Sequence, residues 1–110
     1  MIIDFEKINE EVINNFKGGL GELDTRNFVD ENNKIMLSKL KPGASSGYHV
    51  HEQNCEIVYI ISGEGYFKYD DTTERIVAGK VHYCPKGHGH SMLNDGKDDL
   101  VYLAIVPELR

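Results

Sequence analysis

The sequence has few of the residues that cross-link a chain or restrict its backbone. In 110 residues it has no tryptophan, three prolines and two cysteines. Cys55 and Cys84 form no Cys-x-x-Cys pair, which makes a redox motif or a disulfide framework a poor interpretation. We therefore expect two free, buried and unreactive thiols.

Long apolar runs and clusters of basic residues are also missing. The longest apolar runs, Ile57–Ile61 and Leu100–Val106, fall far short of the roughly 20 residues that span a bilayer. The first residues, MIIDFEKINEE, do not resemble a signal peptide, so we expect a cytoplasmic protein with no membrane partner. The formal charge is −6 and the twelve lysines and arginines are scattered, which excludes nucleic acid as the expected partner.

The chain is long enough for one compact domain, and no linker or repeat indicates a second. Apolar residues between positions 4 and 16 follow helical spacing, with Asp4 as N-cap and Gly18-Gly19 as the stop. We expect residues 1–20 to form a short helical or extended segment packed on a barrel, and residues 21–110 to form that single domain.

After Gly21 the pattern changes to short β-rich runs separated by turn residues. We expect strands at 22–28, 34–41, 47–51, 55–62, 65–70, 73–77, 81–84, 90–94 and 99–106. This many short strands in one domain predicts an all-β fold, an antiparallel sandwich or barrel.

Three side chains that can bind metal lie close together before the first long apolar strand. His49 and His51 are two residues apart, so they project from the same face of a strand. Glu56 is out of phase with them, but a turn at residues 52–54 would return it to the same interior. His90, after the Pro85-Lys86-Gly87 turn, is a fourth candidate.

These residues belong to two spaced motifs that resemble the cupin family. The first motif is Gly, five residues, His-x-His, four residues, Glu, six residues and Gly; the second is Gly, five residues, Pro-x-Gly, two residues, His, three residues and Asn. This chain matches every position, with Gly43, His49, His51, Glu56 and Gly63 in the first and Gly79, Pro85, Gly87, His90 and Asn94 in the second. The resemblance implies a double-stranded β-helix, or jelly-roll barrel.

The resemblance also implies that His49, His51, Glu56 and His90 bind one metal ion per chain. Imidazole and carboxylate together suit a first-row divalent ion such as Mn, Fe, Ni, Cu or Zn. Four protein ligands leave one or two positions open on an octahedral ion, where a substrate or dioxygen binds.

Two functions fit such a site. One is a metal-dependent enzyme with oxygenase- or isomerase-type chemistry on a small organic acid, sugar or other carbonyl or enol metabolite. The other is a non-catalytic module that binds or senses a small molecule through its metal. The catalytic group is not identified; the candidates are His88, Tyr102 and Arg26.

Each candidate also has a simpler interpretation. His88 is either a rim residue near the metal or an exposed loop histidine. Arg26 either enters the barrel to bind a carboxylate or is a surface residue. Tyr102 is either pocket wall or core, and His82 is interpreted as a half-exposed strand residue.

The strand at 56–62 has an apolar outer face. By alternation Glu56, Val58 and Ile60 point inward, and Ile57, Tyr59 and Ile61 point outward. An apolar outer face needs a cover, either the N-terminal helix or a second copy of the chain, and we expect a homodimer.

Overall fold

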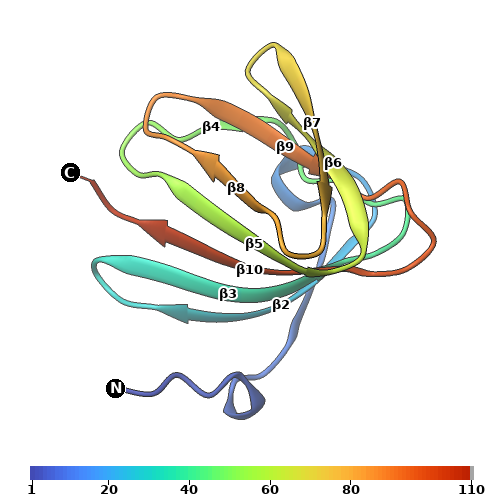
Figure 1. Cartoon of the computed structure of the whole chain (residues 1–110). Helices are drawn as coiled ribbons and strands as arrows, with labels where there is room; N and C mark the ends of the chain where they lie inside the picture. Colours follow the sequence, from blue (N-terminus) through green and yellow to red (C-terminus); the bar gives the residue numbers. More distant parts are fainter. Residues whose placement is uncertain (110) are drawn as a thin grey trace.

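The computed structural model describes residues 1–109 and consists of two antiparallel sheets that face each other (Figure 1). The strands are β1 (Glu11–Asn14), β2 (Glu22–Val29), β3 (Asn33–Leu40), β4 (His49–Val50), β5 (Glu56–Ser62), β6 (Glu64–Tyr69), β7 (Thr72–Val77), β8 (Val81–Cys84), β9 (Gly89–Leu93) and β10 (Leu100–Pro107). Two 3-10 turns, η1 (Phe5–Lys7) and η2 (Phe16–Gly18), are the helical elements of the described residues. The expected all-β fold is confirmed.

One sheet has six strands in the order β1-β2-β3-β10-β5-β8, and the other has four in the order β4-β9-β6-β7. Between them lies an apolar core, with Phe67, Ile60, Leu100 and Val58 as its least exposed large side chains. Each expected strand is present, and most begin and end within two residues of the expected positions. The one expected at 47–51 is regular only at His49–Val50.

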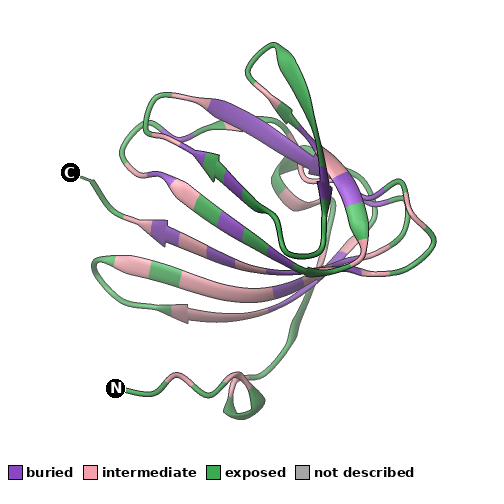
Figure 2. Cartoon of the chain, viewed as in Figure 1, coloured by how far each residue is buried: buried purple, intermediate pink, exposed green. Residues whose placement is uncertain are grey.

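Strand β5 alternates as expected between the core and the surface (Figure 2). Val58 and Ile60 are at most 1% exposed, whereas Ile57, Tyr59 and Ile61 are 36–45% exposed. The alternation also places Glu56 on the inner side, at the first residue of the strand.

The prediction of a helix between residues 4 and 16 is wrong. Asp4 does cap a helical turn, because its side chain accepts a hydrogen bond from the Glu6 N–H, but that turn ends at Lys7. Residues Glu11–Asn14 then pair antiparallel with β2, with Val12 opposite Asp24. The open edge of β2 offers backbone partners that helical spacing does not reveal, and β-branched Val12 and Ile13 suit a strand.

A close approach of two backbone segments brings η2 against the strand that carries the first ligand candidate. Gly47 donates a backbone hydrogen bond to the Phe16 carbonyl, and a Cβ at Gly47 would collide with the Lys17 carbonyl. Only glycine permits this approach, which places Phe16 and Lys17 beside His49 at one end of the barrel. No helix within residues 1–109 is long and apolar enough to cross a membrane.

Candidate metal centre

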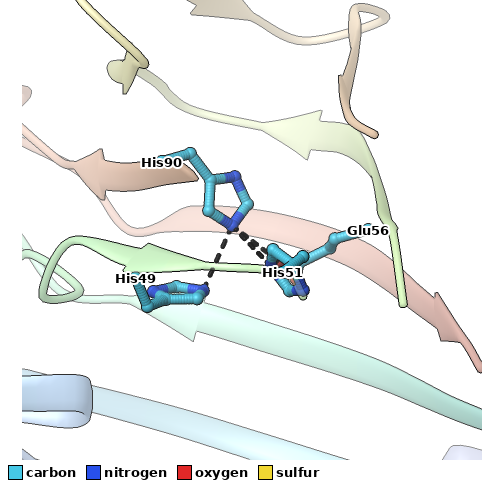
Figure 3. Close-up of side chains that lie close together, drawn as sticks. All are labelled: His49, His51, Glu56 and His90. Carbon is cyan, nitrogen blue, oxygen red and sulfur yellow. Dashed lines mark hydrogen bonds and ion pairs between the residues drawn. The ribbon is translucent and has the colours of Figure 1, made fainter. Parts of the chain in front are cut away.

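Four side chains from three parts of the chain converge between the two sheets (Figure 3). His49 lies in β4, His51 directly after it, Glu56 at the start of β5 and His90 in β9. The β4–β9 ladder pairs His49 with His90, which fixes their side chains on the same face. One ligand atom from each of the four residues lies within 4.8 Å of every other, so the structure brings together all four predicted ligands.

The spacing of these atoms fits a divalent ion. The His90 Nε2 atom lies 2.9 Å from Glu56 Oε1, 3.0 Å from His51 Nε2 and 3.2 Å from His49 Nε2. His51 Nε2 lies 3.2 Å from Glu56 Oε1. Metal–nitrogen bonds of about 2.1 Å at right angles place neighbouring ligand atoms about 3.0 Å apart. The donor set and its spacing therefore fit a first-row metal ion.

The outer nitrogen of each imidazole is occupied, which leaves the inner nitrogen to the centre. His49 Nδ1 lies 2.8 Å from the Gly47 carbonyl, and His51 Nδ1 lies 2.6 Å from Asn54 Oδ1. Since an oxygen acceptor requires an N–H donor, both rings carry a proton on Nδ1, and Nε2 is the atom left to bind a metal. His90 Nδ1 lies 3.0 Å from Nε2 of a fourth histidine, His82.

Burial and mutual contacts shift the acidities of these ligands in the metal-free chain. Burial raises the pKa of Glu56, but hydrogen bonds that His51 and His90 donate when they carry a second proton on Nε2 more than offset that effect and bring the pKa to about 2. The hydrogen bond to Glu56 raises the pKa of His51, whereas burial lowers the pKa of His49. The carboxylate is thus ionised at neutral pH and ready to bind a cation.

A cavity of about 350 Å³ lies beside the four ligand candidates, and His49, His51 and Glu56 contribute to its wall. The opposite wall is the inner face of β2 and β3, where buried hydroxyls form a row. Thr25 Oγ1 donates to Asn27 Oδ1 over 2.6 Å and lies 2.7 Å from Ser38 Oγ. Two cationic side chains, Lys17 and Lys34, also line the cavity.

The three candidate catalytic residues lie in different places. Tyr102 lines the cavity, and its buried hydroxyl is hydrogen-bonded to Ser38; burial raises its pKa well above the usual range. The Arg26 guanidinium lies on the outer side of β2, donates to the Phe5 and Ile8 carbonyls, and does not enter the cavity. His88 is half-buried, and its Nδ1 lies 2.6 Å from Asp70 Oδ2, away from the cavity wall.

The sequence did not predict the positions of two residues near the ligand candidates, His82 and Lys17. His82, interpreted as half-exposed, is 3% exposed, and that interpretation is wrong. In the four-residue strand β8 it points inward with Cys84, while Val81 and Tyr83 point outward. Lys17 sits in η2 with a positive φ of 55°, a backbone conformation that no sequence pattern signalled here.

Comparison with known proteins finds a family, a relative and solved structures that are similar to this chain in sequence or fold. Residues 36–106 match the family model described as the cupin domain. The chain is 38% identical over 112 residues to an oxalate-binding protein of Thermotoga maritima, with 96% of this chain and 93% of the relative covered.

Two solved structures illustrate the range of similarity. A predicted oxalate decarboxylase from Thermotoga maritima superposes with a TM-score of 0.92 at 35% identity, covering 99% of this chain and 100% of the other. An RmlC-like cupin from Shewanella frigidimarina superposes with a TM-score of 0.78 at 15% identity, covering 96% and 87%, which is a likeness of fold alone.

Proposed function

The chain belongs to the cupin family, and from that premise we propose that it binds one first-row divalent metal ion and uses it to bind a small carboxylate anion such as oxalate. His49, His51, Glu56 and His90 would hold the ion. The observation that carries the proposal is the convergence of three imidazole Nε2 atoms and one carboxylate oxygen, with the outer nitrogen of every ring already hydrogen-bonded.

The charges of the site support an anionic ligand. Three neutral imidazoles and one carboxylate leave a divalent ion with one net positive charge, and a bound ion of this kind supplies Lewis-acid attraction for carboxylate oxygens. Besides the proposed ligands, the charged groups of the cavity wall are Lys17, Lys34 and Glu52, so this wall carries one net positive charge in a chain whose formal charge is −6. Lys17 is close enough that its charge opposes protonation of His51.

The polar wall of the cavity supports binding of oxygen-rich ligands. Thr25 and Ser38 are at most 2% exposed, yet they lie on the inner faces of β2 and β3, where apolar side chains would pack as well. Because the Thr25 hydroxyl donates to Asn27 Oδ1, the Asn27 amide N–H groups are left to face a ligand. The protein relative named for oxalate binding supports the choice of a carboxylate.

The size of the cavity indicates which acids to test. At roughly 30 Å³ per water molecule, a cavity of about 350 Å³ holds about a dozen water-sized groups. Oxalate fills only part of this space. The proposal therefore includes longer dicarboxylates and hydroxy or oxo acids as ligands of the same site.

A metal-dependent enzyme is the second candidate, with oxygenase-, isomerase- or decarboxylase-type chemistry on the same acids. It is favoured by the similarity to a predicted oxalate decarboxylase over the whole chain. Such chemistry needs a group that moves a proton, and Tyr102, Lys17 and Glu52 are titratable groups of the cavity wall that are not proposed as ligands. Tyr102 is the one among the three predicted catalytic candidates that lies in the cavity.

A homodimer is part of the proposal. The outer face of β5 and β8 exposes a group of large apolar side chains: Ile57, Tyr59, Ile61, Val81 and Tyr83. A contiguous apolar face of a sheet favours burial against a matching face, and a second copy supplies one by two-fold symmetry.

Calorimetry with oxalate tests the proposed function. We expect protein loaded with one Mn²⁺ per chain to bind oxalate, and metal-free protein to bind it at least about tenfold more weakly because the Lewis acid is missing. Acetate, with one carboxylate, serves as the matched weak ligand. Equal oxalate affinity with and without metal would contradict the proposal, and release of formate and CO₂ from oxalate would favour the enzyme over the binding module.

A further inference from the structure

Behind His90 lies a hydrogen-bonded chain of side chains that ends at the protein surface. His90 Nδ1 lies 3.0 Å from His82 Nε2, and His82 Nδ1 lies 2.8 Å from Glu74 Oε1. Glu74, in β7, is partly exposed, whereas the His82 side chain is 1% exposed. The chain Glu74–His82–His90 thus runs from solvent to the candidate metal centre.

The direction of these hydrogen bonds follows from the chemistry of the groups. An ionised carboxylate only accepts, so His82 must carry a proton on Nδ1. His90 faces Glu56 and the other ligands with Nε2, so a ring that binds metal through this atom carries its proton on Nδ1 and donates it to His82 Nε2. The two hydrogen bonds then agree, because His82 holds its proton on Nδ1, next to Glu74, and accepts at Nε2.

This support differs from that of the other two histidine ligands. His49 donates to a backbone carbonyl, which can only accept, and His51 donates to the amide oxygen of Asn54, whose NH2 group lies 3.4 Å from Glu108 Oε1. His82 is an imidazole, which donates or accepts at either nitrogen depending on its tautomer. The tautomer of His90 therefore depends on a residue two contacts away, Glu74, and His82, which lies between them, is buried.

Packing holds His82 in one orientation. Its ring stacks on Phe67 with centroids 3.6 Å apart and planes 12° apart, and Phe67 is 1% exposed. Glu74 and His82 lie on β7 and β8, the edge strands of two different sheets, so their contact spans the seam between the sheets. This packing explains where the His82 ring lies. It does not explain why the residue is a histidine, because a Phe or Leu would fill the same space without the two hydrogen bonds.

We propose that Glu74 and His82 are positioning residues that hold His90 in its metal-binding tautomer and so set the metal affinity of the site. This inference rests on the proposed metal function. Partners that orient a ligating histidine typically contribute about 10- to 100-fold to metal affinity. Glu74 and His82 act through His90 and do not contact the metal ion or the bound acid.

Four variants test the pair by competition with a metal chelator. His82→Phe keeps the stacking volume but offers no acceptor to His90, and we expect it to weaken metal binding by about 10- to 100-fold. Glu74→Ala lets His82 adopt either tautomer, and we expect a smaller loss. His82→Gln offers His90 an amide oxygen while its amide N–H donates to Glu74, so the carboxylate still selects the acceptor and we expect near wild-type affinity.

The double variant Glu74→Ala with His82→Phe tests whether Glu74 acts through His82. We expect Glu74→Ala to cost nothing further in the His82→Phe background, because no imidazole is left for the carboxylate to orient. Glu64→Gln, an exposed glutamate on the neighbouring strand β6, is the matched control and should leave metal affinity unchanged. Unchanged affinity in folded His82→Phe and Glu74→Ala would overturn the inference.

Nitrogen NMR of metal-free wild-type protein provides a reading that does not depend on metal binding. We expect His82 to show a protonated Nδ1 and an unprotonated Nε2. The opposite tautomer would overturn the inference even if the wild-type chain binds metal. If wild-type protein bound no metal while His82 showed the expected tautomer, the proposed function would fail, and with it the role in metal affinity, although the hydrogen-bond directions would stand.

Discussion

His49 and His90 are direct cross-strand partners in the β4–β9 ladder, and their Nε2 atoms lie 3.2 Å apart. Direct partners project from the same face of a sheet, so strand register alone brings together two imidazoles that are 41 residues apart in sequence. A slip of one residue would turn one of them to the opposite face. The candidate metal centre is therefore built into the pairing of the two strands.

Loss of His51 should weaken metal binding while the barrel still folds. His51→Ala removes one ring nitrogen from the centre, and we expect metal affinity to fall by at least about an order of magnitude. The core consists of packed apolar strands, so the circular dichroism spectrum should be unchanged. His88→Ala is the matched control, because His88 contacts Asp70 and lies outside the cavity wall. Full metal retention in His51→Ala would contradict the assignment.

Removal of a cavity lysine should weaken the binding of carboxylates more than the binding of metal. For Lys34→Gln we expect oxalate affinity to fall about two- to fivefold at low ionic strength, since the lysine is exposed and screened by salt. Calorimetry at two salt concentrations measures the effect. Lys68→Gln on β6, whose side chain does not line the cavity, is the control. An equal loss in both variants would show that net charge, not the cavity, is responsible.

The Cys84 thiol should resist alkylation in the folded protein. It is fully buried, and burial raises its pKa to about 12, so almost no thiolate exists at about pH 8. We expect iodoacetamide to label Cys84 only after unfolding, as measured by mass spectrometry of digested protein. Rapid labelling of native protein at Cys84 would contradict the burial described for β8.

Asp70 should stabilise the loop that precedes β9 at neutral pH and lose this effect in acid. The Gly89 N–H and the His88 ring lower the pKa of Asp70 below its ordinary value of 3.8. A depressed pKa means that this contribution is complete above the ordinary value and is lost as the pH falls through the folded value. We expect the melting temperature of Asp70→Asn to depend less on pH below about pH 4 than that of wild type.

Asn is a suitable replacement because residue 70 has a positive φ of 49°, which Asn tolerates. Thermal unfolding between neutral pH and pH 3 checks the difference in slope. Parallel curves for the two proteins would contradict the role of Asp70.

A charge on the outer face of β5 should disrupt the proposed homodimer. Tyr59→Glu places a carboxylate within the apolar group formed by Ile57, Ile61, Val81 and Tyr83. We expect light scattering to report a dimer for wild type and a monomer for this variant. Tyr48→Glu, at an exposed tyrosine outside β5 and β8, is the control. A monomeric wild type would contradict the proposed dimer and leave the metal site unaffected.

The sequence predicted the strands from alternation, and the spacing of the cupin motifs predicted the cluster of four ligand candidates that the structure brings together. Alternation in β5 correctly separated Val58 and Ile60 from Ile57 and Tyr59. The strand β1 was missed because its partner is the open edge of β2, which is a tertiary contact. The burial of His82 was missed because the inner face of β8 depends on Phe67 and Glu74, which belong to the opposite sheet.

The most direct test of the proposed metal site is elemental analysis of protein first stripped of metal and then reloaded with excess Mn²⁺ and desalted. The proposed function predicts about one ion per chain in wild type and a large loss in His90→Ala, with both proteins folded. A wild-type chain that retains no ion, or a His90→Ala variant that retains as much as wild type, would contradict it.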